Sequence, residues 1–241
     1  MGLVGKKMIS YVTNSSQKIN ILSDRLLNTF CFLEDQSKLE ILPNALPFEL
    51  DDEPEVEKKD EGEINVLFLF NLIEAKGYYD VLEAIRLLSE RGVVNRFEFN
   101  FAGKVMLHPE QDRINTDIKT AKNNFESMLE ELNENASVKY HGVVFGEKKI
   151  DLLKKADVFI LPTYYSIEAQ PITLIEAMAF GCSILSTDYR AIPEMLKDKV
   201  NGFFIEEKNP ADTANKLESY NLDILWKHKN ESINLYESKF R

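Results

Sequence analysis

Two glutamates in this chain could share one ligand, because a helix start is predicted between them. Glu168 and Glu176 have seven residues between them, and Pro171 suits the first turn of a helix, where its missing N–H costs nothing. Apolar residues at helical spacing follow until Gly181. Because unpaired backbone N–H groups at a helix start favour an anion, the stretch predicts an anion site. Glu168 would lie in the loop before it and Glu176 inside the helix.

This layout fits a ligand that carries a diphosphate between two sets of hydroxyl groups. A nucleotide-sugar is such a ligand: its diphosphate would lie at the helix start, its sugar hydroxyls at one glutamate and its ribose hydroxyls at the other. The alternative is an amphipathic helix in which Glu176 is solvated and Glu168 is an ordinary loop acid. A short motif taken alone favours that alternative.

Other candidates lie where predicted strands end. Lys76 follows one strand and opens a helix, so its ammonium could be aimed at a phosphate, although a Lys-Gly pair there is usually solvated. Gly103 and Gly142 end two more strands and would let backbone approach a ligand, or they are simple turn glycines. His141 could act as a general base, but a partly buried histidine that holds a loop is the favoured reading.

The elements that must position these residues alternate regularly. Apolar runs expected to be strands occupy residues 64–70, 97–102, 138–140, 158–161, 183–186 and 202–205. Helical patterns fall between them, at about 81–91, 116–132 and 148–156, then from Pro171, from Ile192 and from Pro210. The alternation predicts an α/β fold, a doubly wound, Rossmann-like parallel sheet. Such sheets bind ligands at the carboxyl ends of their strands.

We expect four segments along the chain. Residues 1–47 read as a helix, strand, helix and strand, with Ser23 as an N-cap, and are too few to bury both faces of a sheet. They belong to an upstream domain or pack onto the domain downstream of them. Residues 48–63 are an acidic linker, residues 64–220 the main domain, and residues 221–241 a C-terminal helix.

Composition excludes several classes. The net charge of −11, concentrated in the acidic segment, argues against a nucleic-acid partner, which needs a basic face. No apolar run approaches the ~20 residues that span a bilayer, and no secretory signal is evident, so a cytoplasmic location is expected. Cys31 and Cys182 are too few for a disulfide framework and are expected to be buried thiols.

The glycine-rich, Gly-x-Ser-x-Gly and His-Glu-x-x-His motifs of dehydrogenases, P-loop nucleotidases, serine hydrolases and zinc proteases are absent. So is the Asp-x-Asp metal motif, and we expect no metal.

Several of these stretches together resemble the donor half of the retaining glycosyltransferases of family 4, which belong to glycosyltransferase group 1. The likeness rests on the Glu-x7-Glu helix with its flanks at residues 156–163, 186–188 and 192–194, and it covers about residues 19–220. Residues 43–47 match the place where the first domain of that family hands over to the second. The resemblance implies the second domain of a GT-B glycosyltransferase with a small remnant of the first. It also implies transfer of a hexosyl group from a nucleotide-diphosphate sugar to a hydroxyl acceptor, with retention, in cell-surface polysaccharide or glycoconjugate synthesis.

The resemblance also implies residue roles. Glu168 would be catalytic and hold the donor sugar, Glu176 the ribose, and Lys76 with Asn71 the diphosphate. The remaining donor contacts would be Gln170, Pro171, Ile172 and Thr173 at the same anion, Gly103 on the sugar or phosphate side, and Gly142 with Val143 near the nucleobase. The chain departs from the family at Phe70, where a glycine is usual, and at Asn71, where an arginine is usual, which leaves diphosphate binding with one charge fewer.

Two rivals remain open at this point. One is a non-catalytic module that binds a nucleotide-sugar but lacks the acceptor site and needs a complementary N-terminal domain or subunit; in many members of the family the catalytic histidine comes from the first domain. The other is a sugar phosphorylase, which shares the architecture, although no lysine is placed for a pyridoxal cofactor. The acceptor would be a sugar or a lipid-linked sugar, which fits a position at the inner membrane face.

Overall fold

One parallel sheet of six strands forms the body of the molecule. The computed structural model describes residues 3–33, 35–46 and 62–241, with residues 3–7 as backbone only. The strand order is β5-β4-β3-β6-β7-β8, and every pairing is parallel. The strands are β3 (Ile64–Leu69), β4 (Phe97–Ala102), β5 (Ser137–Tyr140), β6 (Val158–Leu161), β7 (Ser183–Ser186) and β8 (Gly202–Phe204).

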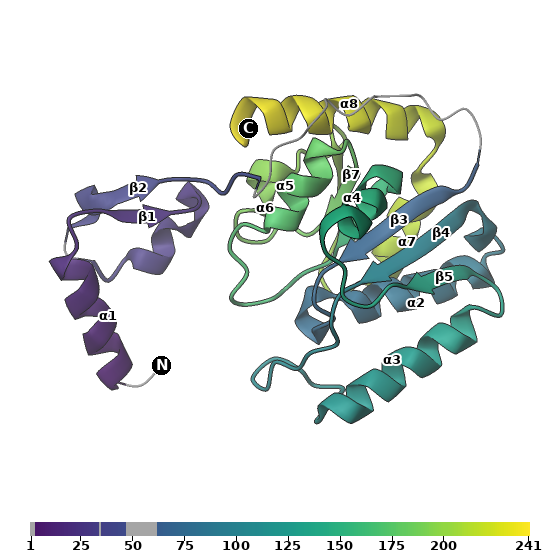
Figure 1. Cartoon of the computed structure of the whole chain (residues 1–241), viewed down its shortest axis with the longest axis horizontal. Coiled ribbons are helices and arrows are strands. Elements are labelled where there is room, and N and C mark those ends of the chain that lie inside the picture. Colours follow the sequence, from purple (N-terminus) through teal and green to yellow (C-terminus); the bar gives the residue numbers. More distant parts are fainter. Residues whose placement is uncertain (1–2, 34, 47–61) are drawn as a thin grey trace.

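Helices cover both faces of this sheet, as Figure 1 shows. They are α2 (Tyr78–Glu90), α3 (Ile118–Leu132), α4 (Gly146–Lys155), α5 (Ile172–Ala179), α6 (Ile192–Met195), α7 (Pro210–Ser219) and α8 (Leu222–Lys239), with the short helices η3 (Glu74–Lys76) and η4 (Val94–Arg96). Side chains alternate along β3: Val66 and Phe68 pack with α2, α3 and α7, whereas Leu67 and Leu69 pack with α4, α5 and α8. Two apolar layers result, and the predicted doubly wound α/β fold is confirmed.

The strand order reverses between β3 and β6. From β3 the chain runs outward through β4 to β5, then crosses back to β6 and continues through β7 to β8 on the other side. In an open α/β sheet, ligands bind in the crevice at the carboxyl ends of the strands where the order reverses. The loops after β3 and β6 therefore flank the expected ligand position.

Predicted and observed elements agree closely. The bounds of β4, β6 and β7 are those predicted, and the other strands and helices differ by one or a few residues at their ends. Pro171 is not the first helical residue but its N-cap, with an extended ψ of 115°, so α5 begins at Ile172. The division into domains stays a prediction, and residues 48–61 of the predicted linker lie outside the described residues.

The N-terminal part forms a separate two-stranded parallel sheet. It comprises α1 (Leu3–Ser15), β1 (Ile19–Ile21), η1 (Asp24–Phe30), η2 (Gln36–Lys38) and β2 (Leu39–Ile41), and β1 pairs with β2. Ser23 caps η1 as expected, but the helix is a 3₁₀ helix in which only Leu26 is buried. Cys31 is exposed there, so the expectation of a buried thiol was wrong for it, whereas Cys182 is buried. The short η1 buries too little surface to cover its cysteine.

The C-terminal helix α8 lies along α5 and β7 (Figure 1). Tyr236 and Phe240 are buried in the layer that α5 helps to form. Among the described residues, no helix is both long enough and apolar enough to cross a bilayer.

Candidate functional site

Lys76 and Glu168 meet at the crevice between β3 and β6. Lys76 ends η3, the short helix in the loop after β3, and its ammonium forms an ion pair with the Glu168 carboxylate from the loop after β6. Both side chains are about nine-tenths buried. Two residues that are 92 positions apart in sequence are thus brought together where the topology predicts a ligand.

Close packing of the two loops makes this meeting possible. Gly77 has φ of +81°, and a Cβ on it would lie 2.2 Å from the carbonyl oxygen of Pro162, so only glycine fits. The backbone N–H of Tyr164 donates to the carbonyl of Ala75 at 2.9 Å. The loop after β6 therefore lies directly against η3.

Aromatic rings surround the Lys76 ammonium. Its Nζ lies 5.1 Å from the ring centroid of Phe70 and 4.9 Å from that of Tyr165, distances at which a cation is attracted to a ring face. Phe70 thus provides a ring contact at the position where a glycine was expected by resemblance. Asn71, the next residue, is exposed. An incoming phosphate would compete with Glu168 for Lys76 and leave that carboxylate free to accept hydrogen bonds.

Glu176 is buried inside α5 and is not a solvated surface acid. Only 1% of its surface is exposed, and its Oε1 accepts a hydrogen bond from Lys149 of α4 at 2.5 Å. Its Oε2 is buried without a hydrogen-bond partner among the described residues. Because a buried acceptor without a donor is costly, this oxygen is a place where a ligand hydroxyl would be favourable.

The start of α5 lies between the two glutamates, as predicted. Ile172 is 40% exposed there, and the N–H groups of a first helical turn have no acceptor within their helix. The Gln170 side chain points elsewhere: its Oε1 accepts from the backbone N–H of Asn44 at 2.6 Å and its Nε2 donates to the carbonyl of Leu22 at 3.1 Å. Pro171 has no N–H, so the backbone N–H groups of Gln170, Ile172 and Thr173 are the remaining donors of the predicted anion site.

The predicted glycine tips have different surroundings. Gly103 has φ of +144°, and a Cβ on it would lie 1.8 Å from the carbonyl oxygen of Phe70, so its packing against the loop after β3 accounts for the glycine. Its N–H donates to the carbonyl of Gly142 at 2.8 Å. Gly142, at φ of +64°, has no atom within 4 Å of an added Cβ, and Val143 is 52% exposed. These last two residues are accessible to a ligand.

His141 holds a structural hydrogen bond. Its Nε2 lies 2.7 Å from Oδ1 of Asn100, and with the amide oriented in this way the ring nitrogen donates. Partial burial, followed by the nearby Lys148 and Lys139, lowers the pKa of His141 below its usual value. The bond to Asn100 agrees with the loop-holding interpretation of His141.

The N-terminal part docks beside the site through polar contacts. Arg25 donates from Nη2 to Asp188 at 2.9 Å and from Nε to the carbonyl of Arg190 at 2.8 Å. The hydroxyl of Ser23 donates to Glu194. Together with the bonds that Gln170 forms with Asn44 and Leu22, these contacts hold the N-terminal part against the segment after β7 and against the end of the loop that carries Glu168.

Sequence reasoning missed Lys149, Tyr165 and Glu74. Lys149 is one of several lysines on α4, and nothing in its spacing singles it out as the partner of Glu176. Glu74 lies close to Lys76 in sequence, and Tyr165 lies close to Glu168. This closeness is the sequence signal by which the two residues could have been found. Within the described residues, no cluster of three histidine, cysteine or acidic side chains could hold a metal ion.

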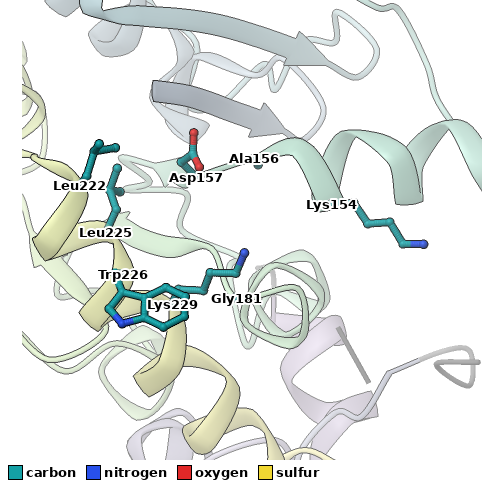
Figure 2. A pocket seen from close by; sticks show the side chains of 8 residues that line it. All are labelled: Lys154, Ala156, Asp157, Gly181, Leu222, Leu225, Trp226 and Lys229. Atoms are coloured by element: carbon teal, nitrogen blue, oxygen red, sulfur yellow. The ribbon is translucent and has the colours of Figure 1, made fainter. Parts of the chain in front are cut away.

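A small cavity lies at the opposite, amino edge of the sheet. Figure 2 shows it between the start of β6 and β7 and helix α8, with Asp157, Gly181, Trp226 and Lys229 among the residues that line it. Its volume of about 50 Å³ admits only a water molecule or two. It is too small and too far along the strands to belong to the crevice of Lys76 and Glu168.

Comparison with known families gives a match over most of the chain. The model of the family described as glycosyl transferases group 1 matches residues 50–232. The putative colanic acid biosynthesis glycosyltransferase WcaL of Escherichia coli (strain K12) is 28% identical over 161 residues, which cover 65% of this chain and 36% of that protein. The amylovoran biosynthesis glycosyltransferase AmsK of Erwinia amylovora is 30% identical over 148 residues, 60% of this chain and 32% of that protein. The matches thus span about a third of the length of these relatives.

Solved structures share the fold. HepE of Anabaena, in complex with UDP-glucose, superposes with a TM-score of 0.75 at 12% identity, over 100% of this chain and 64% of that one. A glycosyltransferase from Rickettsia africae gives a TM-score of 0.72 at 17% identity, over 100% of this chain and 63% of that one. At these identities the likeness concerns the fold, and it agrees with the α/β architecture of GT-B glycosyltransferases that the sequence predicts.

Proposed function

This chain belongs to the glycosyl transferases group 1 family, and from that premise we propose that it binds a nucleotide-diphosphate sugar at the crevice between β3 and β6. The protein would transfer the glycosyl group to a hydroxyl acceptor with retention at the anomeric carbon, as a family 4 enzyme. The observation that carries the proposal is the meeting of Lys76 and Glu168 at the point where the strand order reverses.

Most of the predicted residues have a role in this proposal. The diphosphate replaces Glu168 as the ion-pair partner of Lys76 and also binds the first N–H groups of α5. These groups stabilise the negative charge of the leaving group as the glycosyl bond breaks. Glu168, released from the ion pair, accepts hydrogen bonds from the donor sugar. The buried Oε2 of Glu176 accepts from the ribose. Asn71 and Gly103 line the diphosphate side, and Gly142 with Val143 the nucleobase side.

The relatives support a role in polysaccharide synthesis. WcaL and AmsK are named for the biosynthesis of colanic acid and amylovoran, and HepE was solved with UDP-glucose. We therefore extend the proposal to a sugar or lipid-linked sugar as acceptor, at the cytoplasmic face of a membrane. No metal has a role in it, because Lys76 and the α5 N–H groups meet the charge of the leaving group.

A second candidate is a donor-binding module that needs a complementary domain for transfer. The two-stranded sheet of β1 and β2, whose residues other than Ile21 are not buried, supports it. Transfer needs donor and acceptor held together, since positioning provides much of the rate. On this candidate the 241-residue chain binds the donor but transfers sugar only with the added domain; robust transfer by the chain alone would contradict it.

Calorimetric titration with UDP, GDP and ADP tests the shared part of both candidates. We expect heat and a thermal shift with at least one of the three nucleotides, and a loss of both in Lys76→Met. No heat and no thermal shift with any of them would end the proposal.

A further inference from the structure

The segment between β4 and α3 ties the two loops of the site together. It comprises residues 104–117, here called the strap, and it contacts both the loop after β3 and the loop after β6. In Figure 1 it is the stretch that joins the end of β4 to the start of α3. Three sets of contacts define what it does.

The first set fixes the start of the strap to the loop after β3. Leu72 and Val105 form an isolated parallel bridge. The N–H of Leu72 donates to the carbonyl of Lys104 at 2.8 Å, and the N–H of Met106 donates to the carbonyl of Leu72 at 3.1 Å. The strap therefore continues β4 alongside the residues that lead to Lys76.

The second set fixes its far end to Glu74, two residues before Lys76. The buried Glu74 carboxylate accepts from the backbone N–H groups of Arg113 at 2.6 Å and Asn115 at 2.7 Å, and from that of Ile114. The Asn115 side-chain amide donates to it as well, at 2.9 Å. Hydrogen bonds to a charged carboxylate are stronger than neutral ones, so this end is firmly held.

The third set reaches the loop after β6. Gln111 bonds Ser166 twice: its Oε1 accepts from the Ser166 N–H at 3.0 Å, and its Nε2 donates to the Ser166 hydroxyl at 2.6 Å. The His108 ring packs edge-on against Tyr165, with the centroids 5.3 Å apart. Ser166 lies in the turn that the N–H of Glu168 closes on the carbonyl of Tyr165 at 2.8 Å. A strap anchored at Glu74 thus holds the turn that carries Glu168.

From this geometry we infer that Gln111 is a positioning residue for the donor sugar, acting through Ser166 on Glu168. The inference rests on the proposed function, since it assumes that Glu168 binds the sugar. The strap keeps the sugar-binding turn in a fixed position relative to Lys76, because Glu74 and Lys76 belong to the same short helix η3. Gln111 touches neither the diphosphate-binding Lys76 nor the ribose-binding Glu176, so its loss should weaken binding of the sugar more than binding of the nucleotide.

The test compares Gln111→Leu with wild type in paired titrations: UDP with UDP-glucose, GDP with GDP-mannose, and ADP with ADP-glucose. In the pair that wild type binds, we expect the affinity for the nucleotide-sugar to fall about tenfold, because binding must then order a turn that two hydrogen bonds hold in wild type. The affinity for the nucleotide should change less than about twofold. The exposed neighbour Glu110 provides the control, Glu110→Gln, which should change neither affinity. Ser166→Ala should lower the affinity for the nucleotide-sugar by part of that amount. The double variant Gln111→Leu, Ser166→Ala should bind about as weakly as Gln111→Leu alone, because both substitutions remove the same contact.

Hydrogen exchange of the free protein gives a readout without ligand. The amides of Ser166 and Glu168 should exchange faster in Gln111→Leu than in wild type or Glu110→Gln. Unchanged exchange at both amides, or equal loss of affinity for nucleotide and nucleotide-sugar, would overturn the positioning role while leaving the proposed function intact. If wild type bound no member of any pair, the proposed function would fail and the inference with it.

Discussion

The two edges of the central sheet differ in the buried polar groups they contain: ion pairs at the carboxyl edge and a neutral hydrogen-bond network at the amino edge. At the carboxyl edge, buried carboxylates pair with lysines: Glu168 with the buried Lys76, and Glu176 with Lys149, whose side chain is 23% exposed. At the amino edge, the Ser183 hydroxyl lies 2.8 Å from both the Tyr220 hydroxyl and Nδ1 of His228, all buried and uncharged.

The difference separates function from stability. Buried ion pairs often contribute little to stability compared with apolar packing, so stability does not explain their presence at one edge. A functional reason is that a charged ligand can replace one partner of the pair. A neutral network whose members bond one another has no group to offer a ligand and instead fixes α8 to the start of β7. Changes at the carboxyl edge should therefore alter ligand binding, and changes at the amino edge stability alone.

Lys76→Met should have the largest effect. It leaves the Glu168 carboxylate buried without its cation, which should lower the free energy of unfolding by about 3 kcal/mol and abolish nucleotide binding. Adding Glu168→Gln should restore much of the stability and none of the binding. Urea denaturation and calorimetry measure the two quantities; unchanged stability and binding in Lys76→Met would remove the distinction between the edges.

Acid should weaken the amino edge through His228. Burial, with a smaller effect of Lys227, lowers the pKa of His228 from 6.5 to about 4. Between pH 6.5 and pH 4, His228 is protonated in the unfolded chain but not in the folded chain. The free energy of unfolding is therefore highest above pH 6.5 and decreases as the pH falls toward 4. Between pH 7 and pH 5 this loss is about 2 kcal/mol.

A matched variant isolates the His228 contribution. In His228→Asn the difference in unfolding free energy between pH 7 and pH 5 should shrink by that amount, while nucleotide affinity at pH 7 stays at the wild-type value. Equal pH dependence in the two proteins would mean that His228 titrates normally in the fold.

Glu176→Gln should weaken nucleotide binding by about 1 to 3 kcal/mol, the range for hydrogen bonds to a charged group. The substitution keeps the shape of the side chain, so the far-ultraviolet circular dichroism should be unchanged. Wild-type affinity in this variant would show that the buried Oε2 does not meet the ribose.

Two glycines give the smallest and most closely matched comparison. Gly142 at the carboxyl edge and Gly92, just before η4 and the start of β4, both have positive φ with no atom within 4 Å of an added Cβ. Alanine at either should cost about 1 kcal/mol of stability from backbone strain alone. Only Gly142→Ala should also reduce nucleotide affinity, because a side chain there would enter the nucleobase side of the site; equal binding by both variants would remove Gly142 from it.

Much of this architecture was predictable from local patterns. Val158–Leu161 and Ser183–Ser186 are short apolar runs with clear boundaries, and buried parallel strands read in that way. The first and last turns of helices followed from proline, glycine and asparagine, as at Asn209 before α7. The Lys76 and Glu168 candidates were found because each follows a strand that the topology brings to one crevice.

What sequence reasoning could not supply are contacts between elements. Lys149 pairs with Glu176 because α4 packs beside α5, and Gln111 reaches Ser166 because Glu74 folds the strap back; neither has a signature in spacing. The buried state of His228 depends on α8 lying over the start of β7, although its helix pattern is plain. The exposure of Cys31 reflects how little surface η1 buries, which its apolar residues alone do not reveal.

Hydrogen-exchange mapping with a bound nucleotide-sugar tests the central claim most directly. With UDP-glucose, GDP-mannose or ADP-glucose at saturation, we predict slower exchange in residues 71–77, 142–146 and 165–174, and no change around Trp226 and Lys229, which line the cavity of Figure 2 at the amino edge. Protection confined to the amino edge, or no protection with any of the three ligands, would contradict the assignment of the crevice between β3 and β6 as the donor site.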